Sequence, residues 1–198
     1  MCDDAARHAA NQTGVPLAVL QAVTRVETGR DGADGLMPWP WAVNEGGDSH
    51  WFDSETEAVV FVQTALDAGL TNIDVGCFQL NHRWHGNKFA TLDAMFDPDI
   101  NALEAAQFLA DLASKAGDWR SAVAAYHSRT PDHANRYLAR FDAVMAAMAP
   151  DATTDTLPDP QTRVAENRYP LLQAGLRGSA GSLVPQLGSG QPLFRQVE

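Results

Sequence analysis

Apolar residues recur at three- and four-residue intervals through most of residues 1–150, which is the spacing of amphipathic helices. A short helix is expected over residues 3–12, and a second begins at Pro16 with Gly29 just past its end. Further helices are expected over residues 54–69, 101–117, 119–126 and 130–148. The pattern therefore predicts a mainly α-helical fold.

Two stretches lack the helical periodicity. Residues 30–53 are dense in Gly, Trp and Pro, and we expect them to be irregular. Residues 73–81 are too short and too interrupted by glycine for a helix, and they indicate a strand or an extended loop. The helical domain should therefore contain a small extended or β element in its middle.

The composition changes near Pro150. Residues 151–198 contain 5 Pro and 5 Gly, whereas all the Trp, Cys and His residues of the chain precede them. Such a segment buries too little apolar surface to order itself strongly. We expect one domain over residues 1–150, followed by a flexible C-terminal extension over residues 151–198.

The charge of the chain excludes two classes of partner. Its 198 residues include 14 Lys and Arg but 25 Asp and Glu, and most of the net charge of −11 lies in residues 1–150. Non-specific nucleic-acid binding depends on basic side chains at phosphates, so no nucleic-acid partner is expected. Docking on anionic lipid is disfavoured for the same reason. No stretch approaches the ~20 apolar residues of a membrane span.

The two cysteines leave several interpretations open. Cys2 and Cys77 are compatible with two free thiols, with a disulfide or, for Cys2, with a lipid attachment site. The first residues also lack the apolar segment of a signal peptide. The chain is therefore either cytosolic or begins after an export signal has been removed.

Glu27 is the most informative single residue. It lies seven residues after Leu20 and four after Val23, so it continues the apolar stripe of its helix. Partial burial and a place in the last helical turn both favour a raised carboxyl pKa, which suits a general acid. The alternative is an ordinary helix-end Glu paired with Arg25 or Arg30.

Tryptophans gather in the segment from Pro38 to Phe52, which includes Trp39 and Trp41. Their faces suit stacking on sugar rings, and the alternative is that they close the core over a glycine-rich loop. His82 and His85, with His50 and Asp74, invite a metal interpretation, but no Glu follows the first His as in the zincin pattern. We therefore expect no metal and no cofactor.

Four separated segments, in this order, resemble the soluble-type, goose-lysozyme-like lytic transglycosylases. They are Glu27-Thr28-Gly29, Gly76-Cys77-Phe78-Gln79-Leu80-Asn81, Phe96-Asp97-Pro98-Asp99-Ile100-Asn101 and Ala124-Ala125-Tyr126-His127-Ser128. Each is a weak signal alone, but four in the family's order across residues 20–145 are specific.

The resemblance implies a lysozyme-like helical fold and an enzyme that cleaves the β-1,4 bond between N-acetylmuramic acid and N-acetylglucosamine in peptidoglycan. Cleavage in this family is non-hydrolytic and leaves a 1,6-anhydromuramoyl end. Glu27 would perform both proton transfers, so that a second carboxylate is dispensable. The alternatives are a hydrolytic lysozyme of the same fold and a non-catalytic glycan-binding or assembly module.

The same resemblance implies a set of substrate contacts. Gln79 and the backbone near Phe78 would bind the glycan, the Phe78 ring would floor the groove, and Tyr126 would hydrogen-bond close to Glu27. His127 stands where the family usually has Asn. The expected substrate-binding residues are Thr28, Phe78, Gln79, Asn81, Tyr126 and His127, with Trp39 and Trp41 added as a hypothesis.

The family acts outside the cytoplasmic membrane, which implies a periplasmic protein whose export signal is not in this chain. Export makes a disulfide between Cys2 and Cys77 plausible, bracing the segment that contains Gln79. Members often serve machines that cross the wall, so residues 151–198 have two interpretations: a segment that docks on a flagellar rod or secretion-system protein, or an idle extension without a partner. We expect a monomer that binds peptidoglycan strands, with a groove around Glu27 less acidic than the remaining surface.

Overall fold

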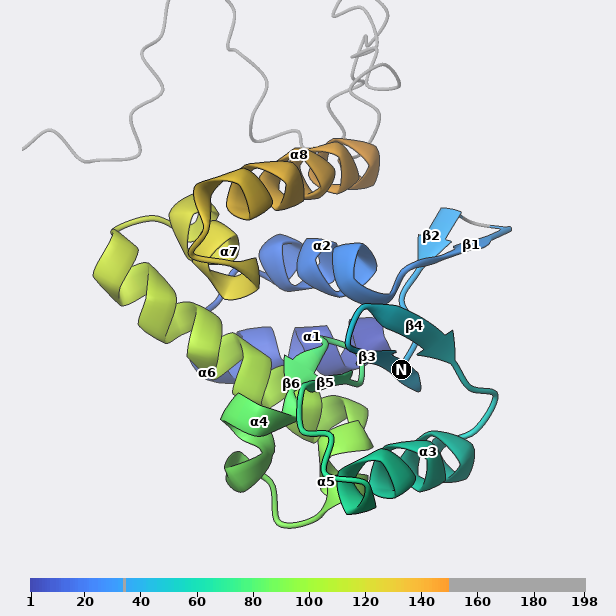
Figure 1. Ribbon diagram of the computed structural model, residues 1–198. Helices are drawn as coiled ribbons and strands as arrows, with labels where there is room; N and C mark the ends of the chain where they lie inside the picture. The colour runs from blue at the N-terminus through green and yellow to red at the C-terminus, as the bar shows by residue number, and fades with distance from the viewer. Residues whose placement is uncertain (34, 150–198) are drawn as a thin grey trace, which may run out of the picture. The chain divides into compact units, whose positions relative to one another are not determined.

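The computed structural model of the protein describes residues 1–33 and 35–149, so the predicted extension over residues 151–198 lies outside the described residues (Figure 1). The described part is mainly helical with small antiparallel sheets in the middle, which confirms that part of the sequence prediction. Its helices are α1 (Cys2–Thr13), α2 (Leu17–Thr28), α3 (Glu55–Asp67), α4 (His82–His85), α5 (Leu92–Phe96), α6 (Pro98–Ala116), α7 (Trp119–His127) and α8 (Pro131–Met148), with a 3₁₀ turn at Gly86–Lys88.

Side-chain caps determine where several helices begin. The Ser54 hydroxyl accepts a hydrogen bond from the backbone N–H of Glu57 at 3.3 Å, as the sequence predicts. The Asp97 carboxylate accepts two such bonds at the start of α6, and Asp118 accepts one at the start of α7. At the other end of α6, Gly117 adopts a left-handed φ of 87°, which only glycine adopts without strain.

The expectation that residues 30–53 are irregular is wrong. They form two antiparallel hairpins, β1 (Arg30–Gly32) with β2 (Gly35–Met37), and β3 (Ala42–Glu45) with β4 (Asp48–Trp51). The second hairpin turns at Gly46 and Gly47, whose φ values of 61° and 111° suit a two-residue hairpin loop. Strands of three or four residues, rich in Gly and Asp, are too short to show alternation in the sequence.

The extended element predicted over residues 73–81 is present as two strands around a tight turn. β5 (Ile73–Val75) and β6 (Leu80–Asn81) complete a four-stranded antiparallel sheet of order β4-β3-β5-β6. Between them the chain turns through Gly76, with φ 80°, and Gln79, with φ 47°. The short helices α4 and α5 were not predicted, because four or five residues do not establish a helical period.

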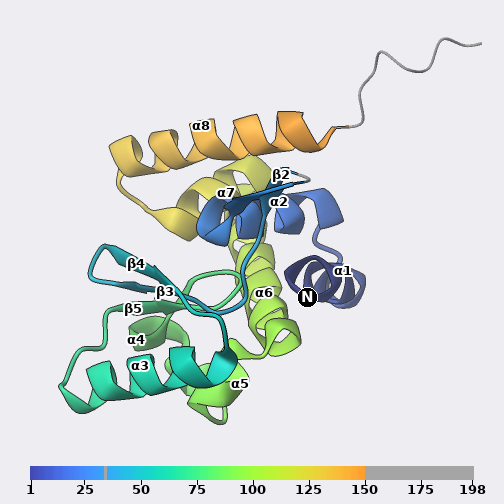
Figure 2. The same ribbon diagram turned by 90° about the vertical axis from the view of Figure 1, so that its right-hand side faces the viewer.

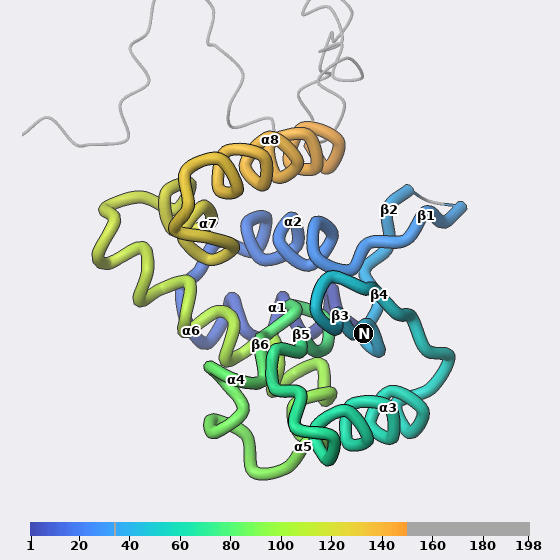
Figure 3. The backbone as a smooth tube through the Cα atoms, viewed as in Figure 1, coloured from blue at the N-terminus to red at the C-terminus, as the bar shows by residue number. Residues whose placement is uncertain are grey.

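The helices and the sheet form two sides around one apolar core. Figure 1 shows α8 lying across α2 and α7, with the sheet, α3 and α5 on the opposite side of α2, and Figure 2 shows the same order after rotation. The tube in Figure 3 brings out how α2 and α8, far apart in the sequence, pack side by side. Core side chains come from both sides, including Leu20, Val62, Phe78, Phe96, Leu109 and Phe141.

A disulfide joins Cys2, at the start of α1, to Cys77 in the turn between β5 and β6. The two Cα atoms are 5.7 Å apart and the residues are separated by 75 positions, and both side chains are buried. The pairing implied by the resemblance is therefore present. Within residues 1–33 and 35–149, no helix is both long and apolar enough to cross a membrane.

We expect the double substitution Cys2→Ala and Cys77→Ala to lower the free energy of unfolding by about 4 kcal/mol, because the bridge restricts the unfolded chain over a separation of 75 residues. Urea denaturation measures the difference. Reductant should destabilise the wild type to the same degree and leave the double variant unchanged. Equal stability of oxidised wild type and double variant would contradict this role.

Candidate active site

Glu27 lies in the last turn of α2 with its carboxyl group partly buried. The ion pairs weighed as its alternative role are not formed. Arg25 instead pairs with Asp3 at 2.6 Å, and the Arg30 guanidinium lies 4.8 Å from the ring centre of Trp39. Interpreting Glu27 as an ordinary helix-end residue paired with an arginine is therefore wrong.

The partner of Glu27 is a tyrosine from α8. The Tyr137 hydroxyl donates a hydrogen bond to Glu27 Oε1 at 2.6 Å, and the ring of Tyr137 is buried. Burial raises the pKa of Tyr137 well above its usual 10.0, so this hydroxyl keeps its proton and remains the donor at neutral pH. In the sequence, Tyr137 is recognisable only as a member of an apolar stripe. Its role as a donor could have been suspected only because the hydroxyl of a buried tyrosine usually requires a hydrogen-bond partner.

The pKa of Glu27 is raised from its usual 4.5 to about 7. Burial is the main cause, because a charged carboxylate loses solvation there. The hydrogen bond from Tyr137 lowers the pKa, the negative charge of Asp74 raises it, and the positive charge of Arg140 lowers it. The carboxyl group is therefore divided between its two protonation states near neutrality, which is the property that a general acid and base requires.

Thr28, which follows Glu27, fastens the end of α2 to the sheet. Its hydroxyl lies 3.0 Å from the carbonyl of Thr24 and 3.3 Å from that of Cys77, and it accepts the backbone N–H of Trp39 at 3.1 Å. The hydroxyl of Thr24 also donates to the Cys77 carbonyl, at 2.7 Å. The Thr28 side chain is only 1% exposed, so its expected role as a substrate contact is replaced by one in positioning Glu27.

The turn between β5 and β6 is held by α6 and α7. Asn101 Oδ1 accepts the backbone N–H of Phe78 at 3.0 Å, while its Nδ2 donates to the carbonyls of Val75 and Met95. The Tyr126 hydroxyl donates to the Phe78 carbonyl at 2.7 Å. A Cβ at Gly76 would lie 2.7 Å from Asn101 Nδ2, so a larger residue has no space there. Residues of α2, α6 and α7, which are distant in the sequence, therefore converge on this turn.

The expected substrate contacts differ in how accessible the structure leaves them. The Phe78 ring is 0% exposed and belongs to the core, so it cannot floor an open groove. Gln79 donates from Nε2 to the carbonyls of Ala42 and Gly76, each at 3.0 Å, which holds its side chain against the backbone. Asn81 caps α4 and donates to Asp74 at 2.8 Å. Asn81 is therefore part of a hydrogen-bonded polar row on the sheet.

Tyr126 and His127 stand near Glu27 without hydrogen-bonding to it. The bond expected from Tyr126 runs to the Phe78 carbonyl, and the hydroxyl that reaches Glu27 is that of Tyr137. The His127 ring stacks on Tyr137 with centroids 4.3 Å apart and planes 8° apart. His127 remains exposed, and burial of part of its ring lowers its pKa together with the charges of Arg140 and His133.

The tryptophans near the site contact the backbone and one another. Trp39 Nε1 donates to the Phe52 carbonyl at 2.7 Å, and Trp41 lies edge-on to Trp39 with centroids 6.0 Å apart. Trp51 donates from Nε1 to the Thr28 carbonyl at 3.4 Å and is 44% exposed. Trp39 and Trp41 are half-buried, and Trp41 packs against the hydrophobic core. Trp51 presents more ring surface than either.

Two of the histidines considered as metal ligands, His85 and His50, have other neighbours. His85 lies 2.9 Å from Glu104, and His50 packs against Phe61 with ring centroids 4.7 Å apart. Asp74 accepts from Asn81 and has a pKa raised mainly by burial. Across residues 1–33 and 35–149, no three potential metal-binding side chains gather at one place.

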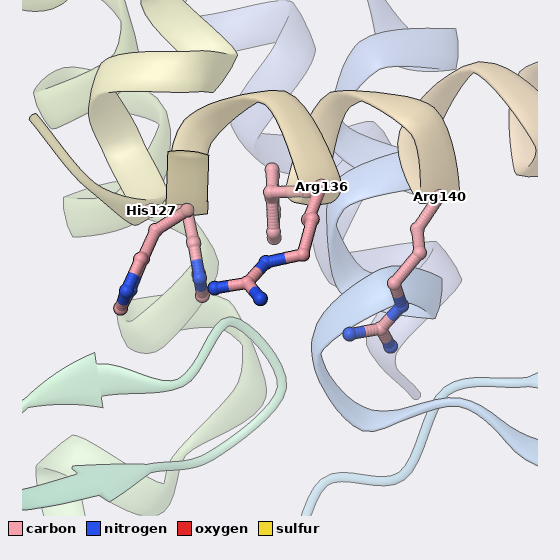
Figure 4. Close-up of a pocket in the computed structure, with 5 residues that line it drawn as sticks. His127, Arg136 and Arg140 are labelled. Atoms are coloured by element: carbon pink, nitrogen blue, oxygen red, sulfur yellow. The ribbon is translucent and has the colours of Figure 1, made fainter. Parts of the chain in front are cut away.

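A pocket of about 270 Å³ opens along α8 and is lined in part by Tyr137, the hydrogen-bond partner of Glu27 (Figure 4). Its lining consists of His127, His133, Arg136, Tyr137 and Arg140. Arg140 also donates to the Val26 carbonyl at 2.8 Å, which ties α8 to the last turn of α2. No acidic residue is part of the lining of this pocket.

Comparison with known proteins identifies no similar protein. No match was found among models of protein families, among curated proteins or among solved structures. The function is therefore argued from the residues and the arrangement of the site.

We expect Glu27→Gln to stabilise the fold at alkaline pH. Folding raises the pKa of Glu27 from 4.5 to about 7, so its contribution to stability is full below pH 4.5 and lost as the pH rises through 7. The amide introduced by the substitution would stay neutral and still accept the bond from Tyr137. The variant should gain about 3 kcal/mol at pH 8 and almost nothing at pH 4, measured by urea denaturation. A gain that is equal at both pH values would contradict the burial of a titrating carboxyl.

Proposed function

We propose that the protein is a peptidoglycan lytic transglycosylase with Glu27 as its only catalytic acid and base. The observation on which the proposal rests is the state of Glu27, whose partly buried carboxyl has a pKa of about 7 and a fixed hydroxyl donor. A carboxyl with that pKa can protonate a leaving group and then accept a proton at the same pH.

In the proposed reaction, the single carboxyl group of Glu27 performs both proton transfers. Protonated Glu27 donates to the glycosidic oxygen between N-acetylmuramic acid and N-acetylglucosamine, and the bond from that oxygen to the anomeric carbon breaks. The 6-hydroxyl of the same muramoyl residue then attacks the anomeric carbon, and the Glu27 carboxylate accepts its proton. The product is a 1,6-anhydromuramoyl end, and Glu27 returns to its protonated form without consuming water.

The spatial convergence of the four sequence segments supports the same proposal. The four segments that resemble one family include Thr28, the turn at Cys77 and Phe78, Asn101, and Tyr126. Hydrogen bonds join the side chains of Thr28, Asn101 and Tyr126 to that turn. Residues that act together in one site should meet in this way. On this proposal the helical domain has a lysozyme-like fold.

The compartment and the partners follow from the substrate. A peptidoglycan substrate places the enzyme in the periplasm, and a disulfide between buried cysteines is consistent with an oxidising compartment. We include in the proposal that cleavage opens the wall locally for an envelope machine such as the flagellum or a secretion system. The docking role assigned to residues 151–198 lies outside the described residues.

A hydrolytic lysozyme is the second candidate, and one observation favours it. Asp74 on β5 is close enough for its charge to raise the pKa of Glu27, so a second carboxylate is present near the first. Glycosidases that use water employ such a pair, with one carboxylate as acid and the other as base or nucleophile. The end group of the product distinguishes the two candidates.

We expect Glu27→Gln to lower the release of products from purified sacculi by about 10²–10⁴-fold, because it removes the only proposed proton donor. Mass spectrometry should identify the wild-type products as 1,6-anhydromuropeptides. Glu57→Gln, the same change at an exposed position on α3, should cleave like the wild type. Unchanged release by Glu27→Gln would refute the proposal. Strand binding by the wild type without any cleavage would support the glycan-binding module instead.

Asp74→Asn tests the two candidate reactions against each other. The substitution keeps an oxygen that can accept from Asn81 but removes the charge near Glu27. Under the lytic mechanism the variant still releases anhydro products, with a pH profile shifted to lower pH because the pKa of Glu27 falls. Reducing-end products from the wild type, together with loss of activity in Asp74→Asn, would establish the hydrolytic candidate. Asp48→Asn, at an exposed position on β4, serves as the control.

A further inference from the structure

The pocket along α8 is cationic in a chain that is otherwise acidic. Residues 1–150 contain 20 acidic and 10 basic side chains, yet two Arg and two His line this one cavity. Figure 4 shows His127, Arg136 and Arg140 drawn along one side of α8 and the end of α7. The charges of Arg140 and His133 also contribute to lowering the pKa of His127, so these groups are close enough to interact electrostatically.

Among the residues that the structure describes, the two arginines of the pocket have no carboxylate partner. Elsewhere Arg7, Arg25 and Arg120 each pair with an aspartate at 2.8, 2.6 and 2.8 Å. Within the described residues, neither Arg136 nor Arg140 has an acidic group at ion-pair distance. Arg140 donates one N–H to the Val26 carbonyl, and a guanidinium has five such donors. The pocket therefore offers N–H donors and positive charge that no ion pair within the described residues uses.

Tyr137 connects this pocket to the catalytic carboxyl. Its ring lines the pocket and stacks on His127, while its hydroxyl donates to Glu27 at 2.6 Å. Arg140 contacts the backbone of Val26, the residue before Glu27. An anion in the pocket is therefore separated from the catalytic group by a single side chain, and it would belong to the part of the substrate next to the bond that is cleaved.

We propose that this pocket, built from His127, His133, Arg136 and Arg140, binds a carboxylate of the glycan strand close to the cleaved bond. The inference rests on the proposed function and names the substrate feature that this site recognises. A guanidinium matches a carboxylate through two parallel N–H···O bonds, and such charge-assisted bonds are stronger than neutral ones. Peptidoglycan offers this group in two places: the lactyl substituent of a bare muramoyl residue and the peptide stem of a substituted one.

Binding of soluble glycan strands to the full chain tests the proposal. All proteins include Glu27→Gln, so that no strand is cut, and Arg136→Gln is compared with Arg129→Gln. Arg129 is exposed before α8 and does not line the pocket, so its substitution is a matched loss of charge. The strands bear native stems, stems whose carboxylates are converted to amides, or no stems and hence free lactyl carboxylates. Calorimetry measures each Kd.

We expect Arg136→Gln to weaken binding of native strands about ten-fold, and Arg129→Gln less than two-fold. The amidated strands should bind both variants equally. A ten-fold effect confined to native strands assigns the pocket to the stem carboxylate, one confined to stem-free strands assigns it to the lactyl carboxylate, and one on both shows that the pocket accepts either. The proposal is overturned if Arg136→Gln matches Arg129→Gln on every strand, if its loss is the same on amidated strands, or if no strand binds.

The same substitutions in the chain that retains Glu27 separate this inference from the proposed function. Arg136→Gln should raise KM about ten-fold on native sacculi and change kcat less than two-fold. Anhydro products with an unchanged KM would overturn the pocket and leave the transglycosylase standing. Cleavage that continues without Glu27 would overturn the transglycosylase, while the binding measurements would still decide the role of the pocket.

Discussion

The buried backbone of the turn between β5 and β6 is the constraint on which the site depends. The carbonyls of Cys77 and Phe78 and the N–H of Phe78 lie inside the core, where an unpaired polar group costs about 1–3 kcal/mol. Thr24 and Thr28 from α2, Asn101 from α6 and Tyr126 from α7 supply the partners, and a disulfide ties the turn to α1. The hydrogen bonds that pair the buried backbone groups of this turn therefore also fix the end of α2, and with it the position of Glu27.

The position that suits Glu27 to acid–base catalysis also makes its charged form unfavourable for folding. Burial raises the pKa of its carboxyl to about 7, and the last turn of a helix disfavours a negative charge. Tyr137 and Arg140, both from α8, offset this by lowering that pKa. The protein thus places a carboxyl where neither protonation state is strongly preferred, and α8 adjusts the balance between them. The cationic side of the same helix then gives the neighbouring pocket its charge.

The sequence indicated the longer helices and Glu27, but not the short helices α4 and α5 or the partners of Glu27. Long helices such as α6 and α8 repeat their apolar positions several times, whereas strands of three or four residues do not, so both hairpins of residues 30–53 were missed. Spacing on α2 was sufficient to suggest a buried carboxyl. The hydroxyl of Tyr137 lies 110 positions away in the chain, and only the packing of α8 on α2 brings it to Glu27. Burial of Phe78 likewise follows from the turn, which no local pattern reveals.

The central claim is that Glu27 is a carboxyl poised between protonation states by its surroundings. Its titration can be followed directly by NMR of the side-chain carboxyl carbon, assigned by comparison with Glu27→Gln. The account predicts a midpoint near pH 7, since burial raises the pKa to about 7, and a higher midpoint in Tyr137→Phe, where the hydrogen bond that lowers the pKa is lost. A midpoint near the usual 4.5, unchanged in Tyr137→Phe, would contradict it.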